Sequence, residues 1–117
     1  MEVQVITPNS DSLAHVSQTL GDDGPLILND LFMGNAELLR IGNCHFVTRV
    51  EEAAGGLEMV IMCAQGEDLV AAGQVLADAA RNVGCKTMRF HTQRPGMARL
   101  LSSFNFHLSE YVYKADL

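Results

Sequence analysis

The sequence predicts an α/β (α+β) fold, and three observations support that prediction. A length of 117 residues suits one hydrophobic core, so residues 1–117 are expected to form a single domain. Short runs of β-branched and aromatic residues alternate with segments whose apolar residues recur at helical spacing. From about Gly55 onward these segments follow the order β-α-β-α-β, which indicates helical crossovers between strands.

The N-terminal third predicts one strand and two helices. Apolar and polar residues alternate at the start, and a Thr-Pro-Asn turn ends that run. A serine or an aspartate can then cap a helix, which a Gly-Asp-Asp-Gly-Pro run breaks. The predicted elements are a strand at Val3–Ile6, a helix from Ser10 or Asp11 to about Leu20, and a second helix at about Asn29–Leu39.

Two strands in the middle of the chain predict a hairpin. The first, Cys44–Val50, is rich in β-branched and aromatic residues. The second, Leu57–Ala64, is apolar almost throughout, which is typical of a strand that is covered on both faces. Glu52–Gly56 supplies the turn between them.

The rest of the chain predicts two helices and two strands. A thin apolar stripe of alanine and glycine lets the first helix lie close to a sheet, and Gly84 can end it. Pro95 fits the first turn of the second helix. The predicted elements are a helix at Asp68–Val83, a strand at Thr87–His91, a helix from Pro95 to about Phe104 and a strand at Phe106–Tyr113.

The formal net charge of −6 is distributed unevenly. Before residue 81 the only lysine or arginine side chains are Arg40 and Arg49, whereas the segment Arg81–Arg99 holds several basic residues and no acid. Such a segment can position an anionic ligand or an acidic partner, although a solvated basic face explains it equally well. The acidic average and the lack of interleaved aromatic residues disfavour nucleic-acid binding.

Composition also bears on location and on metal binding. The sequence has no apolar run long enough to span a membrane, and an acid at Glu2 replaces the basic start of a signal peptide, so we expect a cytoplasmic protein. Cys44, Cys63 and Cys85 lie in apolar stretches without Cys-x-x-Cys spacing. They are expected to be small buried side chains in a reducing compartment, and no metal site is predicted.

The second half resembles the GNAT family of N-acetyltransferases. Gly84–Thr92 looks like the family's helix end and following strand, and Arg99–Phe106 looks like its short helix and Gly-Phe phrase, with Asn105 in the place of the glycine. Glu110–Lys114 matches the last strand in character. The resemblance covers about half of the chain and implies a mixed central sheet with helices on both faces.

The family's cofactor loop, Gln/Arg-x-x-Gly-x-Gly/Ala, is broken in this sequence. With Gln65 in the first position, Asp68 and Val70 stand where small residues belong. In the family, the glycines let backbone amides approach the CoA pyrophosphate at a helix N-terminus. Here Glu67 and Asp68 bring two carboxylates to those amides, so a self-capped helix without a ligand is expected.

The resemblance also implies catalytic positions, and these differ too. Leu101 stands where family members often carry a tyrosine, and Arg94 stands where an asparagine often begins the short helix. Two residues remain as weak catalytic candidates. Glu58 could act as a base through water, or be a surface carboxylate, and His91 could line a cleft, or be a structural histidine.

Two functions remain open. The first is a non-catalytic binding or structural module, similar to the GNAT-like virion proteins of bacteriophages. Its partner, a virion protein or a second copy, would contact Arg81–Arg99 or a sheet edge, and the protein could be incorporated into a virion. The alternative is a minimal N-acetyltransferase that transfers acetyl from acetyl-CoA to an amine, with the cofactor near Gln65, Gly66, Arg94 and Arg99.

Overall fold

The computed structural model describes residues 1–14, 16, 24–90, 106 and 112–117, and the description that follows concerns these residues. In that part of the chain a five-stranded mixed sheet has the order β1-β2-β3-β4-β5, in which β1 to β4 are antiparallel and β5 is parallel to β4. The elements are β1 (Val3–Ile6), α1 (Ser10–Leu13), α2 (Gly24–Phe32), β2 (Glu37–Ile41), β3 (Cys44–Ala53), β4 (Gly56–Gln65), α3 (Leu69–Asn82) and β5 (Cys85–Phe90).

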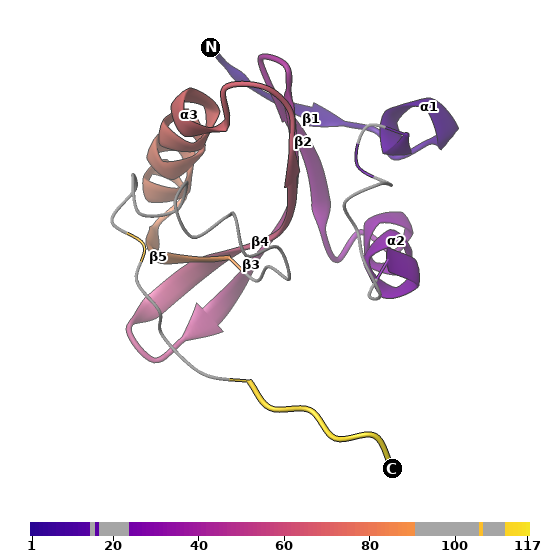
Figure 1. Ribbon diagram of the computed structural model, residues 1–117. Coiled ribbons are helices and arrows are strands. Elements are labelled where there is room, and N and C mark those ends of the chain that lie inside the picture. The colour runs from indigo at the N-terminus through magenta and orange to yellow at the C-terminus, as the bar shows by residue number, and fades with distance from the viewer. Residues whose placement is uncertain (15, 17–23, 91–105, 107–111) are drawn as a thin grey trace.

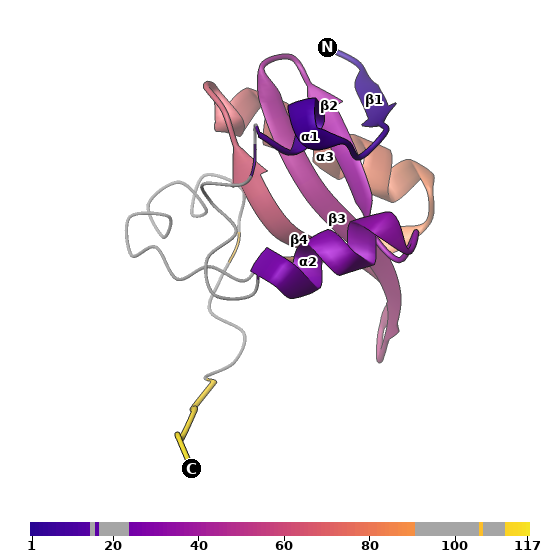
Figure 2. The same ribbon diagram turned by 90° about the vertical axis from the view of Figure 1, so that its right-hand side faces the viewer.

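Helices lie on both faces of the sheet, as predicted. Helix α3 packs on one face, and α1 and α2 pack on the other (Figures 1 and 2). The two faces have separate apolar cores, because alternate strand residues point to opposite sides. Leu39 and Phe46 belong to the core beneath α3, whereas Leu38 and Val47 belong to the core beneath α2.

The core beneath α3 depends on small side chains. Ala72 and Leu76 are completely buried, and Ala80 is nearly so. These residues follow one stripe of α3, so the helix can lie close to the strands as the sequence predicted. Gly84, in the left-handed region with a φ of 96°, ends the helix and donates its amide to the carbonyl of Arg81.

The predicted first strand is confirmed as β1, whereas the helix that follows differs from the prediction in its bounds. Asn9, rather than Ser10 or Asp11, caps α1, and it forms a capping box with Ser12. The helix ends at Leu13 instead of about Leu20, and residues 17–23 lie outside the described residues.

The predicted helix at Asn29–Leu39 is wrong in its second half. Pro25 sits in the first turn of α2 and starts that helix instead of breaking the chain. Gly34, with a φ of 80°, follows the end of α2. The next apolar residues then form β2, where their alternation buries Leu38 on one face and Leu39 and Ile41 on the other.

The hairpin, the long helix and the strand that follows it are confirmed as β3, β4, α3 and β5. All three cysteines are buried thiols outside any disulfide, also as predicted. The predicted helix at Pro95–Phe104 and most of the last strand lie outside the described residues, and the described residues Phe106, Val112 and Tyr113 belong to no strand. Within the described part, no helix is long and apolar enough to span a membrane.

Candidate functional site

The predicted cofactor loop joins the end of β4 to the start of α3. Strand β5 pairs with the first half of β4, from Leu57 to Ile61, and β5 ends at Phe90. Strand β4 continues beyond this pairing to Gln65, and the chain then turns through Gly66 into α3. The loop therefore lies at the end of β4 that extends past the parallel pair.

The loop backbone packs tightly against the turn between β2 and β3. Gly66 has a φ of 139°, and a Cβ atom added there would lie 2.6 Å from the carbonyl oxygen of Asn43 and 2.6 Å from the Cα atom of Cys44. The Cys44 thiol donates a hydrogen bond to the carbonyl oxygen of Glu67, with Sγ 2.7 Å from that oxygen. Glycine is thus required at this position for close approach as well as for backbone conformation.

The electrostatic potential around the loop is negative. Burial, followed by the charges of Asp68 and then Glu67, raises the pKa of the Cys44 thiol above its usual value. The thiol consequently stays protonated at neutral pH and keeps its role as a hydrogen-bond donor. The same two carboxylates would also face any anion that approached the start of α3.

The expectation that α3 is capped by an acidic side chain is wrong for Asp68. Asp68 is the residue that precedes the helix, but its backbone has a φ of 58° and its side chain forms no capping hydrogen bond. Capping side chains normally sit on extended backbone, from which the carboxylate reaches the second or third amide. The left-handed conformation of Asp68 removes that geometry.

Gln65 combines burial with an unsatisfied polar atom. Its Oε1 atom is buried and finds no hydrogen-bond partner within the described part of the chain. Gln65 is opposite His45 in the ladder between β3 and β4, so it sits at the last paired position before the loop. Gln65 ends β4, and Gly66 follows it before the start of α3.

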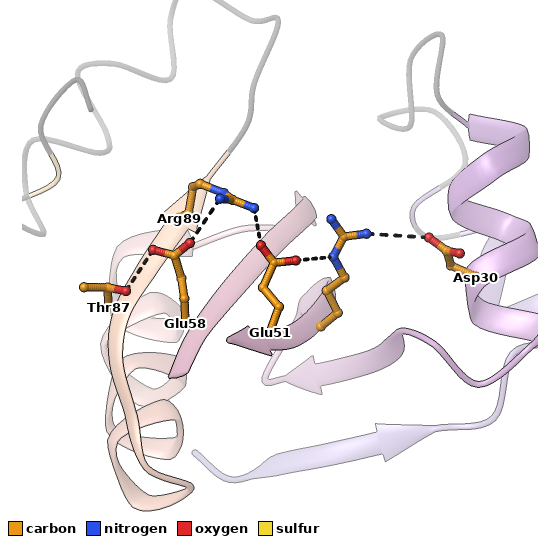
Figure 3. Close-up of polar contacts among 6 residues, drawn as sticks. Asp30, Glu51, Glu58, Thr87 and Arg89 are labelled. Atoms are coloured by element: carbon orange, nitrogen blue, oxygen red, sulfur yellow. Dashed lines mark hydrogen bonds and ion pairs between the residues drawn. The ribbon is translucent and has the colours of Figure 1, made fainter. Parts of the chain in front are cut away.

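Glu58 lies at the opposite end of β4 and belongs to a different cluster. Its carboxylate accepts a hydrogen bond of 2.8 Å from the Thr87 hydroxyl and forms an ion pair of 3.2 Å with Arg89 (Figure 3). Gln65 stands seven positions after Glu58 along β4, a distance of about 23 Å at the rise of a β-strand. The two predicted candidates therefore do not form one site.

Arg89 bridges two carboxylates that face each other across the sheet. Glu51 on β3 is directly opposite Glu58 on β4, and like charges in that position repel. The guanidinium of Arg89 approaches Glu51 at 2.6 Å as well as Glu58 (Figure 3). Arg49 extends the chain of charges, with contacts of 3.1 Å to Glu51 and 3.9 Å to Asp30 on α2.

The charges of this bridge set the ionisation of Glu51. Burial would raise the pKa of this carboxyl group, but hydrogen bonds and charges from Arg89 and Arg49 lower the pKa below its usual value overall. Glu51 therefore stays ionised in the folded protein. Sequence reasoning missed this cluster, although the hairpin turn itself predicts that Glu51 and Glu58 pair.

The remaining predicted residues are distributed as follows. His91, Arg94 and Arg99 lie outside the described residues. Of the basic segment's described members, Arg81 pairs at 2.7 Å with Asp78, and Arg89 lies between carboxylates. Lys86 is exposed. The described residues hold no cluster of three or more side chains suited to a metal ion.

Several solved structures share this arrangement over almost the whole chain. A GNAT family acetyltransferase from Staphylococcus aureus superimposes with a TM-score of 0.58 at 11% identity, and the match covers 100% of both chains. The fold is GNAT-like. An acetyltransferase from Trypanosoma brucei gives a TM-score of 0.60 at 11% identity, over 99% of this chain and 100% of that one.

A solved structure of a transcriptional regulator also shares this fold. A transcriptional regulator from Bacillus halodurans has a TM-score of 0.63 at 17% identity and covers 99% of this chain and 100% of that one. At such identities the likeness concerns the fold alone. No protein-family model matches the sequence, and no curated protein matches it.

Proposed function

We propose that this chain is a GNAT-like binding module that does not hold acetyl-CoA in the loop between β4 and α3. The observation that carries the proposal is the pair of exposed carboxylates, Glu67 and Asp68, at the start of α3. A pyrophosphate at this position would depend on backbone amides and the positive end of the helix dipole, and both carboxylates oppose that attraction. Each like-charge contact with a phosphate instead costs about 1 kcal/mol at a solvated distance of 4 Å.

The packing of the loop supports the same conclusion. The Glu67 carbonyl oxygen already accepts a hydrogen bond from the Cys44 thiol, and Gly66 lies against the backbone of Asn43 and Cys44. The loop is therefore held in place by its contacts with the turn between β2 and β3. Its conformation needs no ligand to satisfy these contacts.

Titration calorimetry with acetyl-CoA and with CoA at low salt tests the proposal directly. We expect no heat of binding at micromolar protein concentrations. Binding in the micromolar range would contradict the proposal and favour the catalytic alternative.

Removal of the two charges should create or strengthen CoA binding. We expect the double variant Glu67→Gln with Asp68→Asn to gain roughly thirtyfold in affinity, since two contacts of about 1 kcal/mol each would be relieved. The matched control is Glu52→Gln with Asp78→Asn, which changes the net charge equally at exposed positions on other elements. An equal gain in both double variants would show that only the overall charge matters.

An N-acetyltransferase is the second candidate, and two observations favour it. The side chain of Asp68 does not cap α3, and the buried Oε1 atom of Gln65 has no partner among the described residues. Arg94 and Arg99 would then hold the CoA phosphates, and His91 would serve as base, because Glu58 lies far from the loop and is engaged by Thr87 and Arg89. Release of free thiol from acetyl-CoA in the presence of a primary amine would establish this activity, and His91→Ala should then reduce it whereas Glu58→Gln should not.

The proposed partner is a protein, and the proposed location is the cytoplasm. A sheet edge or Arg81–Arg99 would provide the contact, since β1 is an outer strand of the described sheet. Incorporation into a bacteriophage virion is the most specific form of this proposal. Mass spectrometry of purified particles would test it, and particles that lack the chain would contradict it.

A further inference from the structure

A groove lies on the face of the sheet that carries α3, beside the C-terminal end of that helix (Figure 1). Its volume is about 440 Å³, which falls within the range of clefts that hold small molecules, about 300–1,000 Å³. Among the described residues, its lining includes side chains from β2, β3, β4 and the end of α3, namely Glu37, Leu39, Thr48, Val50, Met59 and Val83.

Most of these lining side chains are apolar. Leu39 and Met59 are buried members of the core beneath α3, so they form the floor of the groove. Val50 is paired with Met59 in the ladder between β3 and β4 and is 46% exposed. Val83 follows the last residue of α3 and is 61% exposed. The groove therefore offers apolar contact on its floor and at its rim.

Two polar side chains lie next to each other in this apolar surrounding. Glu37 on β2 is directly opposite Thr48 on β3, so their Cβ atoms are about 5 Å apart and on the same face of the sheet. Thr48 is only 3% exposed, yet its hydroxyl forms no hydrogen bond within the described part of the chain. Glu37 is exposed and forms no ion pair in that part. Because a buried hydroxyl normally has a partner, this pair has unused capacity for a ligand.

The charges around the pair favour a cation. Arg49 also lines the groove, but it alternates with Thr48 along the strand, and its guanidinium contacts Glu51 and Asp30 on the opposite face of the sheet. Arg81, in the last turn of α3, pairs with Asp78 at 2.7 Å. The C-terminal end of α3 adds about half a negative charge. The Glu37 carboxylate is therefore left without a positive partner from these neighbours.

We propose that this groove binds a small organic cation, which carries an ammonium group on an apolar body. The ammonium donates hydrogen bonds to the Glu37 carboxylate and to the Thr48 hydroxyl oxygen, while the apolar body covers the floor of the groove. Met59 stands six positions before Gln65 along β4, about 20 Å at the rise of a strand. The groove is thus separate from the loop between β4 and α3, and the inference is independent of the proposed function.

An NMR titration of the isotope-labelled protein with phenethylamine tests the proposal, because this probe carries one ammonium group on an aromatic body. We expect saturable shifts of the backbone amide signals of Leu39, Thr48 and Val50. The expected dissociation constant is about 1 mM, as for a ligand of about nine non-hydrogen atoms at modest efficiency. Hydrocinnamate, a carboxylate of similar shape, should bind more weakly by roughly tenfold or more.

Two single variants remove the polar contacts and keep the shape of the groove. Glu37→Gln should weaken phenethylamine binding by roughly threefold, and Thr48→Val should weaken it by roughly fivefold. The matched control is Glu2→Gln, which changes the net charge equally at an exposed position beyond the other end of the ladder between β1 and β2. This control should bind as the wild type does. Urea unfolding verifies that each variant remains folded.

Four results would overturn the proposal. The first is a titration without saturable shifts. The second is a set of shifts confined to residues outside the groove, which would place the cation elsewhere. The third is hydrocinnamate binding as tight as that of phenethylamine, which would remove the charge argument. The fourth is equal affinity of Glu37→Gln and Glu2→Gln, which would show that only the net charge of the protein matters.

Discussion

Gly66→Ala should destabilise the protein more than alanine does at Gly34, Gly42, Gly55, Gly56 or Gly84. The new Cβ atom would lie 2.6 Å from backbone atoms of Asn43 and Cys44, which cannot move away as the end of a flexible side chain can. The φ of 139° adds backbone strain for any residue with a side chain. Overpacking and strain each cost about 1–3 kcal/mol, so we expect a loss of roughly 2–6 kcal/mol.

Gly34→Ala is the matched control for this substitution. Gly34 also has a positive φ, of 80°, but an added Cβ atom meets nothing within 4 Å. The control therefore carries backbone strain without the collision, and the difference between the two variants isolates the packing of the loop. Urea denaturation midpoints measure both. If Gly66→Ala were no less stable than Gly34→Ala, the close approach of Gly66 to the β2–β3 turn would be contradicted.

Arg89→Leu should destabilise the fold by removing the guanidinium that bridges Glu51 and Glu58. The substitution leaves Glu51 and Glu58 facing each other without the guanidinium between them. The Glu58 side chain is only 15% exposed, so water cannot fully replace the lost partner. Hydrogen bonds to charged groups contribute about 1.5–3 kcal/mol, and partial exposure of Glu51 lowers the expected loss at neutral pH to roughly 1–2 kcal/mol.

The effect of Arg89→Leu should depend on pH with a definite sign. In the wild-type protein the pKa of Glu51 is lowered below its usual value, so its ionised form stabilises the fold at neutral pH, and this contribution is lost as the pH falls through the lowered pKa. In the variant the two facing carboxylates repel, and protonation relieves the repulsion. The difference in unfolding free energy between wild type and variant should therefore shrink below about pH 4.5.

Arg81→Leu is the control for this second variant. Arg81 pairs with Asp78 at 2.7 Å, but both side chains are more than two-thirds exposed, at 71% and 75%. Exposed pairs of this kind contribute little, so the unfolding free energy should change by less than about 0.5 kcal/mol. Equal losses of unfolding free energy in the two arginine variants would mean that the bridge between Glu51 and Glu58 stabilises the fold no more than an exposed ion pair does.

The sequence predicted the elements best where its pattern was long and unambiguous. The apolar stripe of α3 fits only a helix, the two hairpin segments fit only strands, and all three elements are confirmed. The region from Asn29 to Leu39 contains short apolar runs that fit either a helix or a strand. Contact of Leu38 and Leu39 with the two separate cores decided the outcome, and such contact is visible only after the sheet is assembled.

For the candidate site, the sequence predicted only where some residues lie along the chain, for a similar reason. Gln65 and Gly66 follow directly from the end of an apolar strand, so their position beside α3 required no long-range information. The bridge between Glu51, Arg89 and Glu58 joins strands β3, β4 and β5. The position of Arg89 opposite β4 depends on the register of the parallel strand β5, which the chain reaches through the α3 crossover. Nothing in the local sequence specifies that register. The conformation of Asp68 was equally hidden, since an acid before a helix normally caps it.

The order of the strands in the described sheet has a consequence for how the protein folds. Each strand pairs with its neighbours along the chain, and two tight turns connect β2, β3 and β4. Such local pairings close short loops and therefore form quickly, whereas β1 and β5 must close longer connections through helices. The two outer strands should accordingly exchange their amide hydrogens fastest, while the central meander remains protected until global unfolding.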